Sequence, residues 1–261
     1  MTRIVLVDGR VKGESQIGVP PLERTSGIGA FEVLRTHDRA LSTLVLHLER
    51  LERALSEMGI SCDGTALLQE AERAAFEIDG EARVDIRVEH TAQGVERTVI
   101  ASSLEPTDKL QIVSAATVRG PRATSAGHKV LAYGAHGAAL TVAREKGCSD
   151  ALLIDDDGYV REAATANVFG IRGKTLRTPD SDVLRGVTRA LVLDFVSSMG
   201  LTIELAPHSV DSLQASDEVF LTSAVRGVAA VNMIDGRTIG TEKHWYSGAI
   251  ASELQSLLRR K

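Results

Sequence analysis

AGHKVLAY at residues 126–133 and REAATANVF at residues 161–169 decide how this 261-residue chain is interpreted. The first stretch places one lysine, Lys129, among small residues that leave room around its side chain. The second places one glutamate, Glu162, at the start of an uncharged run that follows a predicted strand and turn. A reactive lysine needs a lowered pKa and space for a carbonyl partner, and the first stretch offers that space.

These two stretches together favour a site for an aldehyde cofactor. A lysine amine can form a Schiff base with an aldehyde, and a lone acid can hold the proton of a pyridine nitrogen. A surface lysine at a helix start and a glutamate at a strand end fit the same residues. The two stretches alone leave both interpretations open.

Composition and charge narrow the class of protein. The chain is 43% hydrophobic and 25% charged, which is typical of a soluble globular protein. A formal net charge of -5 favours neither nucleic acid nor an acidic membrane as a partner. No apolar run is long enough to span a bilayer, and the start of the chain has no signal-peptide pattern. Cys62 and Cys148 lack metal-ligand spacing. We therefore expect a reduced, cytoplasmic protein without a metal site.

Apolar spacing predicts alternating strands and helices. Strands are predicted at 4–7, 31–36, 82–90, 98–102, 109–117, 151–154, 167–171, 201–205, 218–222 and 228–234. Helices are predicted at 44–58, 65–77, 138–146, 185–199 and 242–260. The segment 119–127, rich in Gly, Pro and Arg, is the best candidate for a linker between two halves.

Several polar residues occupy positions that could be structural or functional. In the strand 31–36, alternation places Arg35 on one face with two apolar residues, where it either passes the sheet edge or points at an anion. His47 and Arg50 flank the apolar stripe of the helix 44–58, and a solvated helix flank is the alternative to a function. The sequence RGVT at 185–188 opens a helix and could bind a phosphate, although such helix starts are common.

The order of six motifs resembles that of the class IV pyridoxal-phosphate enzymes. The motifs are FEVLR (31–35), HLERL (47–51), AGHKVLAY (126–133), DGYVREAATANVF (157–169), LRGVTR (184–189) and DEVFLTSAVRGV (217–228). That family includes branched-chain, D-amino-acid and (R)-amine aminotransferases and aminodeoxychorismate lyase. The resemblance covers residues from about 3 to 240. It implies a two-domain α/β (α+β) protein of fold type IV, with a smaller domain at 1–117, a linker at 118–122, a larger domain at 123–261 and the cofactor in the cleft between the domains.

The resemblance also implies roles for residues at matching positions. Lys129 matches the Schiff-base lysine, which moves a proton between the cofactor's C4′ and the substrate Cα. Glu162 matches the partner of the pyridine nitrogen, and Tyr133 matches a tyrosine that contacts the phenolic oxygen. Positions that face the phosphate of pyridoxal 5′-phosphate match Arg50, Val187, Thr188, Ser223 and Ala224. Many aminotransferases carry a threonine where this chain has Ala224, so the hydroxyl of that threonine is missing here.

A further set of residues is predicted to contact the substrate. The candidates are Phe31, Val33, Arg35, Arg87 and His90. His90 aligns with an arginine that D-amino-acid aminotransferases use for the substrate carboxylate. Arg35 could supply that contact instead. Arg87 is the second choice, because its strand face is predicted to be exposed.

The implied reaction is ping-pong transamination from a D-amino acid, or an (R)-amine, to a 2-keto acid. A homodimer is expected, since a loop of the second subunit completes the substrate pocket in this family. Aminodeoxychorismate lyase, which forms p-aminobenzoate and pyruvate from 4-amino-4-deoxychorismate, is the first alternative, because SAGHKVL (125–131) and Ala224 resemble that branch. A branched-chain L-amino-acid aminotransferase and a cofactor-binding protein without turnover are the others.

Overall fold

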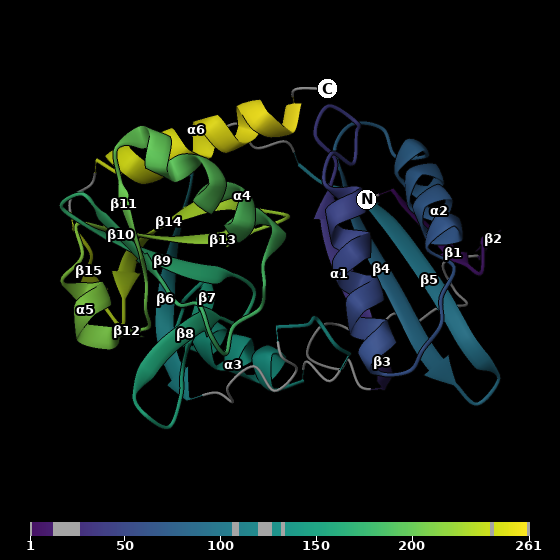
Figure 1. The fold of residues 1–261 in the computed structure, drawn as a ribbon, viewed down its shortest axis with the longest axis horizontal. Helices are drawn as coiled ribbons and strands as arrows, with labels where there is room; N and C mark the ends of the chain where they lie inside the picture. The colour runs from purple at the N-terminus through teal and green to yellow at the C-terminus, as the bar shows by residue number, and fades with distance from the viewer. Residues whose placement is uncertain are drawn as a thin grey trace. The chain divides into compact units, whose positions relative to one another are not determined.

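The structure is a computed structural model that describes residues 2–12, 27–105, 110–119, 127–131, 134–240 and 243–259 (Figure 1). It divides into two compact units. Unit 1 consists of Met1–Pro106, His128–Tyr133 and Leu258–Lys261. Unit 2 consists of Thr107–Gly127 and Gly134–Leu257.

Unit 1 is built on a five-stranded antiparallel sheet in the order β2-β1-β5-β4-β3. Its strands are β1 (Arg3–Val7), β2 (Arg10–Val11), β3 (Ile28–Arg35), β4 (Ala82–Thr91) and β5 (Gly94–Ser103). Helices α1 (Leu44–Glu57) and α2 (Gly64–Phe76) lie side by side over one face of this sheet (Figure 1). Asp8 and Gly9 join β1 to β2 with positive φ angles of 46° and 74°, the backbone that a two-residue hairpin turn requires.

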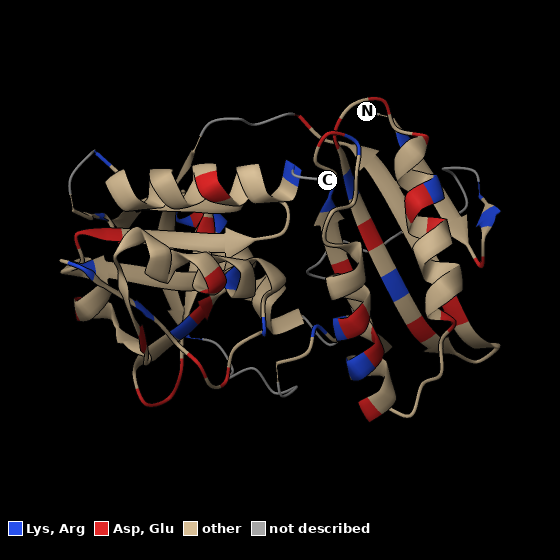
Figure 2. Ribbon diagram, turned by 45° about the horizontal axis from the view of Figure 1, so that its top comes forward, with Lys and Arg blue, Asp and Glu red and all other residues tan. Residues whose placement is uncertain are grey.

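The core of unit 1 lies between the sheet and the two helices. Val84, Ile86 and Val88 alternate along β4, and all three are fully buried in the cluster that contains Leu51 of α1 and Leu67 of α2. The period of two that predicted a strand at 82–90 therefore also selects the face that the helices cover. The intervening residues of β4 are charged and half-buried, and this row of alternating charges can be followed in Figure 2.

Unit 2 is built on a ten-stranded mixed sheet in the order β11-β10-β9-β13-β14-β6-β7-β8-β12, with β15 beside β14. Its strands are β6 (Gln111–Arg119), β7 (Asp150–Ile154), β8 (Tyr159–Ala163), β9 (Asn167–Arg172), β10 (Thr175–Thr178), β11 (Thr202–Leu205), β12 (His208–Ser209), β13 (Glu218–Ser223), β14 (Gly227–Ile234) and β15 (Arg237–Thr238). Its helices are α3 (Gly134–Glu145), α4 (Val187–Val196), α5 (Val210–Gln214) and α6 (Trp245–Arg259), with a 3₁₀ turn, η3, at Ser197–Met199. Phe169 and Phe220 stack across the neighbouring strands β9 and β13, with ring centroids 4.7 Å apart.

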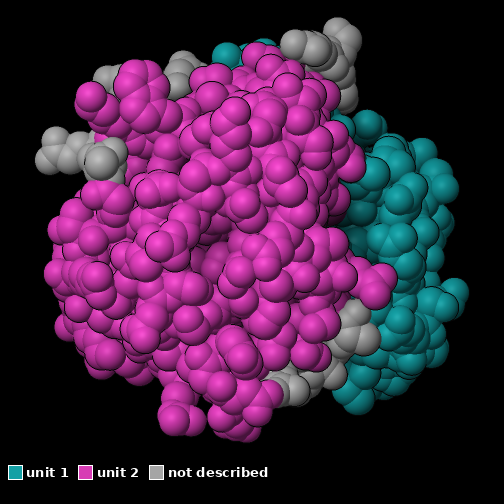
Figure 3. All heavy atoms as spheres, turned by 60° about the vertical axis from the view of Figure 1, so that its left-hand side comes forward, with its two compact units in different colours: residues 1–106, 128–133, 258–261 teal, residues 107–127, 134–257 magenta. Residues whose placement is uncertain are grey.

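The division between the units differs from the predicted domain boundary. The sequence suggested a linker at 118–122, but β6 pairs with β14 and β7 in the sheet of unit 2. The two units, coloured separately in Figure 3, therefore divide at Pro106. Residues 128–133 are assigned to unit 1, and within them the backbone of residues 129–131 pairs with β3. Across the described ranges, no helix is long and apolar enough to cross a bilayer.

Candidate active site

Lys129 lies on a short segment that pairs with β3. The N–H of Phe31 donates to the carbonyl of Lys129, and the N–H of Leu131 donates to the carbonyl of Gly29, both at 2.9 Å. Nζ of Lys129 lies 4.5 Å from the centroid of the Phe31 ring, a distance that suits a cation–π contact. The half-buried lysine is therefore held on the face of β3 that carries Phe31.

The same face of unit 1 carries three of the predicted substrate residues, Phe31, Val33 and Arg87, at defined register positions. Phe31 lies directly opposite Arg87, and Val33 lies opposite Asp85. Arg87 is half-buried, so its face is not the exposed one that the sequence suggested. Burial lowers the pKa of the Arg87 guanidinium, while Asp85 and Glu89 act in the opposite direction.

The two remaining substrate candidates of unit 1 lie at the ends of this strand pair. Arg35, although buried, has its Nη2 3.4 Å from Oε2 of Glu81. His90 lies opposite Ile28, and both side chains are exposed. Tyr133 lies outside the described residues.

Arg50 belongs to a buried polar group that the sequence did not predict. Its Nε donates to Oε1 of Glu32 at 2.7 Å, and its Nη2 donates to Oε2 at 2.5 Å. Nδ1 of His47 lies 2.7 Å from the same Oε2. Arg50 and His47 are thus buried against β3 rather than exposed on the helix flank. Because side chains alternate along a strand, Glu32 lies on the face opposite Phe31, and a carboxylate among the apolar residues of that face is the signal that the sequence offers.

Glu162 is a buried acceptor on β8 in unit 2. Only 4% of it is exposed, and its Oε2 accepts the Leu184 N–H at 2.9 Å. Its Oε1 lies 3.2 Å from Nε2 of His136 on α3. Each carboxylate oxygen has two lone pairs, so these contacts leave Glu162 able to accept a further proton donor. Neither His136 nor the Leu184 N–H was predicted, because both lie more than 20 residues away in the sequence.

The start of α4 is shaped by a neighbouring strand. Asn167 Nδ2 donates to the carbonyl of Leu184 at 2.8 Å. A Cβ atom on Gly186, the N-cap of α4, would lie 2.0 Å from Oδ1 of Asn167, so a side chain here would have to displace the Asn167 amide. Val187 and Thr188 follow in the first turn, where backbone N–H groups have no partner within the helix and favour an anion.

Ser223 ends β13 and begins the turn that contains Ala224. Its Oγ accepts the Arg226 N–H at 3.3 Å. The Arg226 guanidinium pairs with Asp150, which is fully buried, and with the Thr165 hydroxyl. Thr165 in turn donates to Asp150 at 2.5 Å. Arg226 thus connects three segments through its hydrogen bonds: the turn after β13, the turn after β8 and the start of β7.

Arg226→Met is expected to destabilise the protein, because it leaves the Asp150 carboxylate buried without its cation. Breaking a fully buried pair costs about 3–5 kcal/mol, and we expect about 2 kcal/mol here because Arg226 is partly exposed. Urea unfolding followed by circular dichroism measures this loss. Arg177→Met, which breaks a half-exposed pair with Glu204, is the control and should cost less than half as much. Equal losses of unfolding free energy in the two variants would contradict a specific stabilising role for Arg226.

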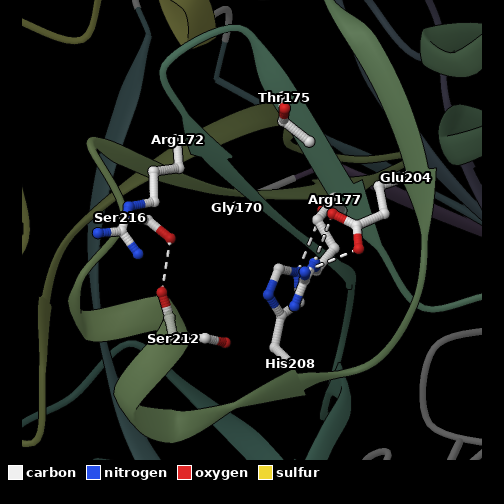
Figure 4. A pocket seen from close by; sticks show the side chains of 8 residues that line it. All are labelled: Gly170, Arg172, Thr175, Arg177, Glu204, His208, Ser212 and Ser216. Atoms are coloured by element: carbon white, nitrogen blue, oxygen red, sulfur yellow. Dashed lines mark hydrogen bonds and ion pairs between the residues drawn. The ribbon is translucent and has the colours of Figure 1, made fainter.

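A cavity of about 250 Å³ also lies in unit 2, beside β9 and β10 (Figure 4). Its lining contains none of the predicted site residues. Arg177 on this lining is paired with Glu204 through two contacts of 3.0 and 2.7 Å. Burial lowers the pKa of His208 to about 4, so that ring is neutral at pH 7. We assign no cofactor group to this cavity.

The residues of each unit fit pyridoxal 5′-phosphate chemically. Lys129 offers a primary amine for the aldehyde, and Glu162 offers a buried carboxylate for a protonated ring nitrogen. The start of α4 offers N–H groups for a phosphate. The Thr222 hydroxyl, next to Ser223, is buried and has no hydrogen-bond partner among the described residues. Polar atoms of this kind are expected where a bound group completes a site.

Comparisons with known proteins agree with this chemistry. The family model for "Amino-transferase class IV" matches residues 29–234. The "Aminodeoxychorismate lyase" of Bacillus subtilis is 25% identical over 281 residues, covering 99% of this chain and 94% of that protein. The "D-alanine aminotransferase" of Bacillus licheniformis is 30% identical over 256 residues, covering 91% of this chain and 90% of that protein.

A solved structure agrees over the whole length. The fold IV-transaminase from Curtobacterium pusillum matches with a TM-score of 0.83 at 24% identity, covering 100% of both chains. That likeness confirms the expected fold type. With the family model spanning most of the sequence, the chain belongs to the class IV aminotransferases, enzymes that use pyridoxal 5′-phosphate.

Proposed function

We propose that the protein transfers an amino group from a D-amino acid, and also from (R)-amines, to a 2-keto acid. The observation that carries this proposal is the 30% identity with a D-alanine aminotransferase over nearly the full length of both chains. The residues on the Lys129 face of unit 1 support it. Phe31 supplies an apolar surface, and Arg87 directly opposite supplies a cation for a substrate carboxylate.

In this proposal Lys129 holds the cofactor covalently and Glu162 pairs with its ring nitrogen. When bound, the cofactor supplies an electron sink for the bond that breaks at the substrate Cα. Lys129, once its amine is released by the amino donor, moves the proton between the substrate Cα and C4′. Glu162 keeps the ring nitrogen protonated, and the Leu184 N–H and His136 fix its carboxylate.

The phosphate is assigned to two groups of residues. Arg50 contributes a guanidinium, and Val187 with Thr188 contributes N–H and hydroxyl donors at the start of α4. Ser223 and the backbone of Ala224 complete the set, and Tyr133 is assigned to the phenolic oxygen. Because Ala224 has no hydroxyl, this set has one donor fewer than a set with threonine there.

For the substrate carboxylate we now favour Arg87 over Arg35. Arg35 is paired with Glu81, whereas Arg87 faces Phe31, the residue beneath the Lys129 amine. His90 is less suited, because its side chain is exposed beyond the covered part of the sheet. We further propose a cytoplasmic homodimer, since the resemblance implies a substrate pocket completed by a second subunit.

Aminodeoxychorismate lyase activity is the second candidate. It is favoured by the match to the Bacillus subtilis lyase over 99% of this chain and by Ala224. That reaction would use the same Lys129 but release pyruvate without a keto acid. Branched-chain L-amino-acid transamination is the third.

A donor screen separates these candidates. The purified protein, loaded with pyridoxal 5′-phosphate, is incubated with D-alanine, L-leucine, an (R)-amine or 4-amino-4-deoxychorismate, each with and without 2-oxoglutarate. We expect D-alanine alone to yield one pyruvate per site, and continuous turnover only when the keto acid is added. Continuous release of p-aminobenzoate and pyruvate without a keto acid would establish the lyase. A preference for L-leucine would contradict the D-amino-acid assignment.

A further inference from the structure

Glu32 is a buried carboxylate in an apolar environment. It lies on β3 between Ala30 and Leu34 on the face that α1 covers, and both neighbours are fully buried. Only 1% of Glu32 is exposed. Moving a carboxylate out of water costs several kcal/mol, so a residue in this position needs strong partners.

The partners are Arg50 and His47, one helical turn apart on α1. Arg50 contacts both carboxylate oxygens, which is the two-pronged geometry that gives a guanidinium one preferred plane. Burial raises the pKa of Glu32, but Arg50 and His47 outweigh it and lower that pKa from 4.5 to about 2. Burial also lowers the pKa of His47, so its neutral ring donates from Nδ1 to the charged Glu32.

Stability alone does not account for this group. A buried ion pair contributes little net stability compared with apolar residues of the same volume, because desolvation offsets the attraction. A leucine at position 32 would match the rest of the helix-covered face of β3. What the ion pair does provide is a fixed direction for the Arg50 side chain.

We propose that Glu32 and His47 are positioning residues that orient Arg50 for the cofactor phosphate. This inference rests on the assignment of Arg50 under the proposed function. Glu32 orients Arg50 but also places a negative charge near it, and these two effects change phosphate binding in opposite directions. The direction of the change in phosphate binding therefore tests the proposal. If orientation dominates, removing the Glu32 charge weakens phosphate binding. If neutralisation dominates, removing that charge strengthens phosphate binding.

Two ligands that differ only in the phosphate measure this effect. The dissociation constants of pyridoxal 5′-phosphate and pyridoxal are determined for each variant by equilibrium dialysis. The Kd of pyridoxal divided by the Kd of pyridoxal 5′-phosphate reports the phosphate contribution alone, and a weaker phosphate contact lowers this ratio. For Glu32→Gln we expect this ratio to fall about 10-fold, near the value of a charge-assisted hydrogen bond. Pyridoxal affinity should change less than about 2-fold, because Lys129 is intact. In an Arg50→Ala background, Glu32→Gln should cause no further fall.

Glu70→Gln is the matched control. Glu70 is also a buried glutamate of unit 1 that pairs with an arginine, Arg97, at 2.9 Å, but it does not contact Arg50. Its substitution should leave the ratio at the wild-type value. An equal fall in Glu70→Gln would show a general structural effect and overturn the proposal. A ratio that is unchanged or raised in Glu32→Gln would overturn it as well.

His47→Gln keeps the proposal testable if Glu32→Gln does not fold. It leaves the contacts between Glu32 and Arg50 in place and removes the imidazole that holds the carboxylate. A fall of about 3-fold in the ratio is expected, and no fall would overturn the proposal. Failure of the proposed function is recognised separately in the donor screen, because the ratio is measured without an amino donor. If borohydride fixes no cofactor on wild-type Lys129, the cofactor site itself is wrongly assigned. If the cofactor is fixed but Arg50→Ala leaves the ratio unchanged, only the role of Arg50 and its positioning residues fails.

Discussion

Lys129→Ala is expected to abolish covalent attachment of pyridoxal 5′-phosphate and to reduce turnover at least about 10⁴-fold, because nucleophile and proton carrier are lost together. Borohydride reduction followed by mass spectrometry of the peptide that contains residue 129 measures the attachment. The fold should persist. The contact between Nζ and the Phe31 ring is worth only about 0.5–2 kcal/mol.

Two further lysine variants make this result specific. Lys129→Arg keeps a cation above Phe31 but cannot form a Schiff base, so it should retain wild-type thermal stability and lose the adduct. Lys146→Ala removes an exposed lysine after α3 and should retain both adduct and turnover. A reduced cofactor adduct that persists in Lys129→Ala would identify a different lysine as the reactive one.

Periodicity predicted the elements of this chain well where each strand or helix buries one face. The spacing of leucines at 44–58 marked the core face of α1, and the alternation at 82–90 marked the face of β4 that the helices cover. Short elements gave weaker patterns. Strand β10, only four residues long, was not predicted, and β6 was placed in the wrong half because pairing partners are not visible in a local pattern.

From the sequence, the candidate site could be predicted only at residues that belong to one of the motifs. Motif order was the basis for assigning Lys129 and Glu162 to the site, and it gave no information about the environment of either residue. Helical spacing placed His47 and Arg50 at the edge of the apolar stripe but could not say how far the buried surface extended. Their burial depends on Glu32, which lies 15 residues before His47 and meets it only when α1 packs on β3. Contacts of this kind follow from tertiary packing.

Glu162→Gln is expected to lower kcat about 10²–10³-fold, the usual cost of losing a preorganised electrostatic partner, while covalent attachment at Lys129 persists. A neutral amide oxygen can still accept the Leu184 N–H, so the segment before α4 should keep its position. What the amide lacks is the charge that keeps the cofactor's ring nitrogen protonated. Steady-state kinetics with D-alanine and 2-oxoglutarate, together with the borohydride adduct, separate loss of rate from loss of cofactor.

Glu218→Gln is the matched control for this prediction. Glu218 is a buried glutamate of the same unit, and it accepts the N–H groups of Tyr246 and Ser247 at 2.8 Å. Both substitutions remove a buried negative charge that holds backbone donors, so their structural costs should be similar. Only Glu162 is assigned to a ring nitrogen, and we therefore expect kcat of Glu218→Gln to stay within about 3-fold of wild type. Comparable losses of kcat in the two variants would mean that Glu162 acts through folding rather than through the charge on the cofactor.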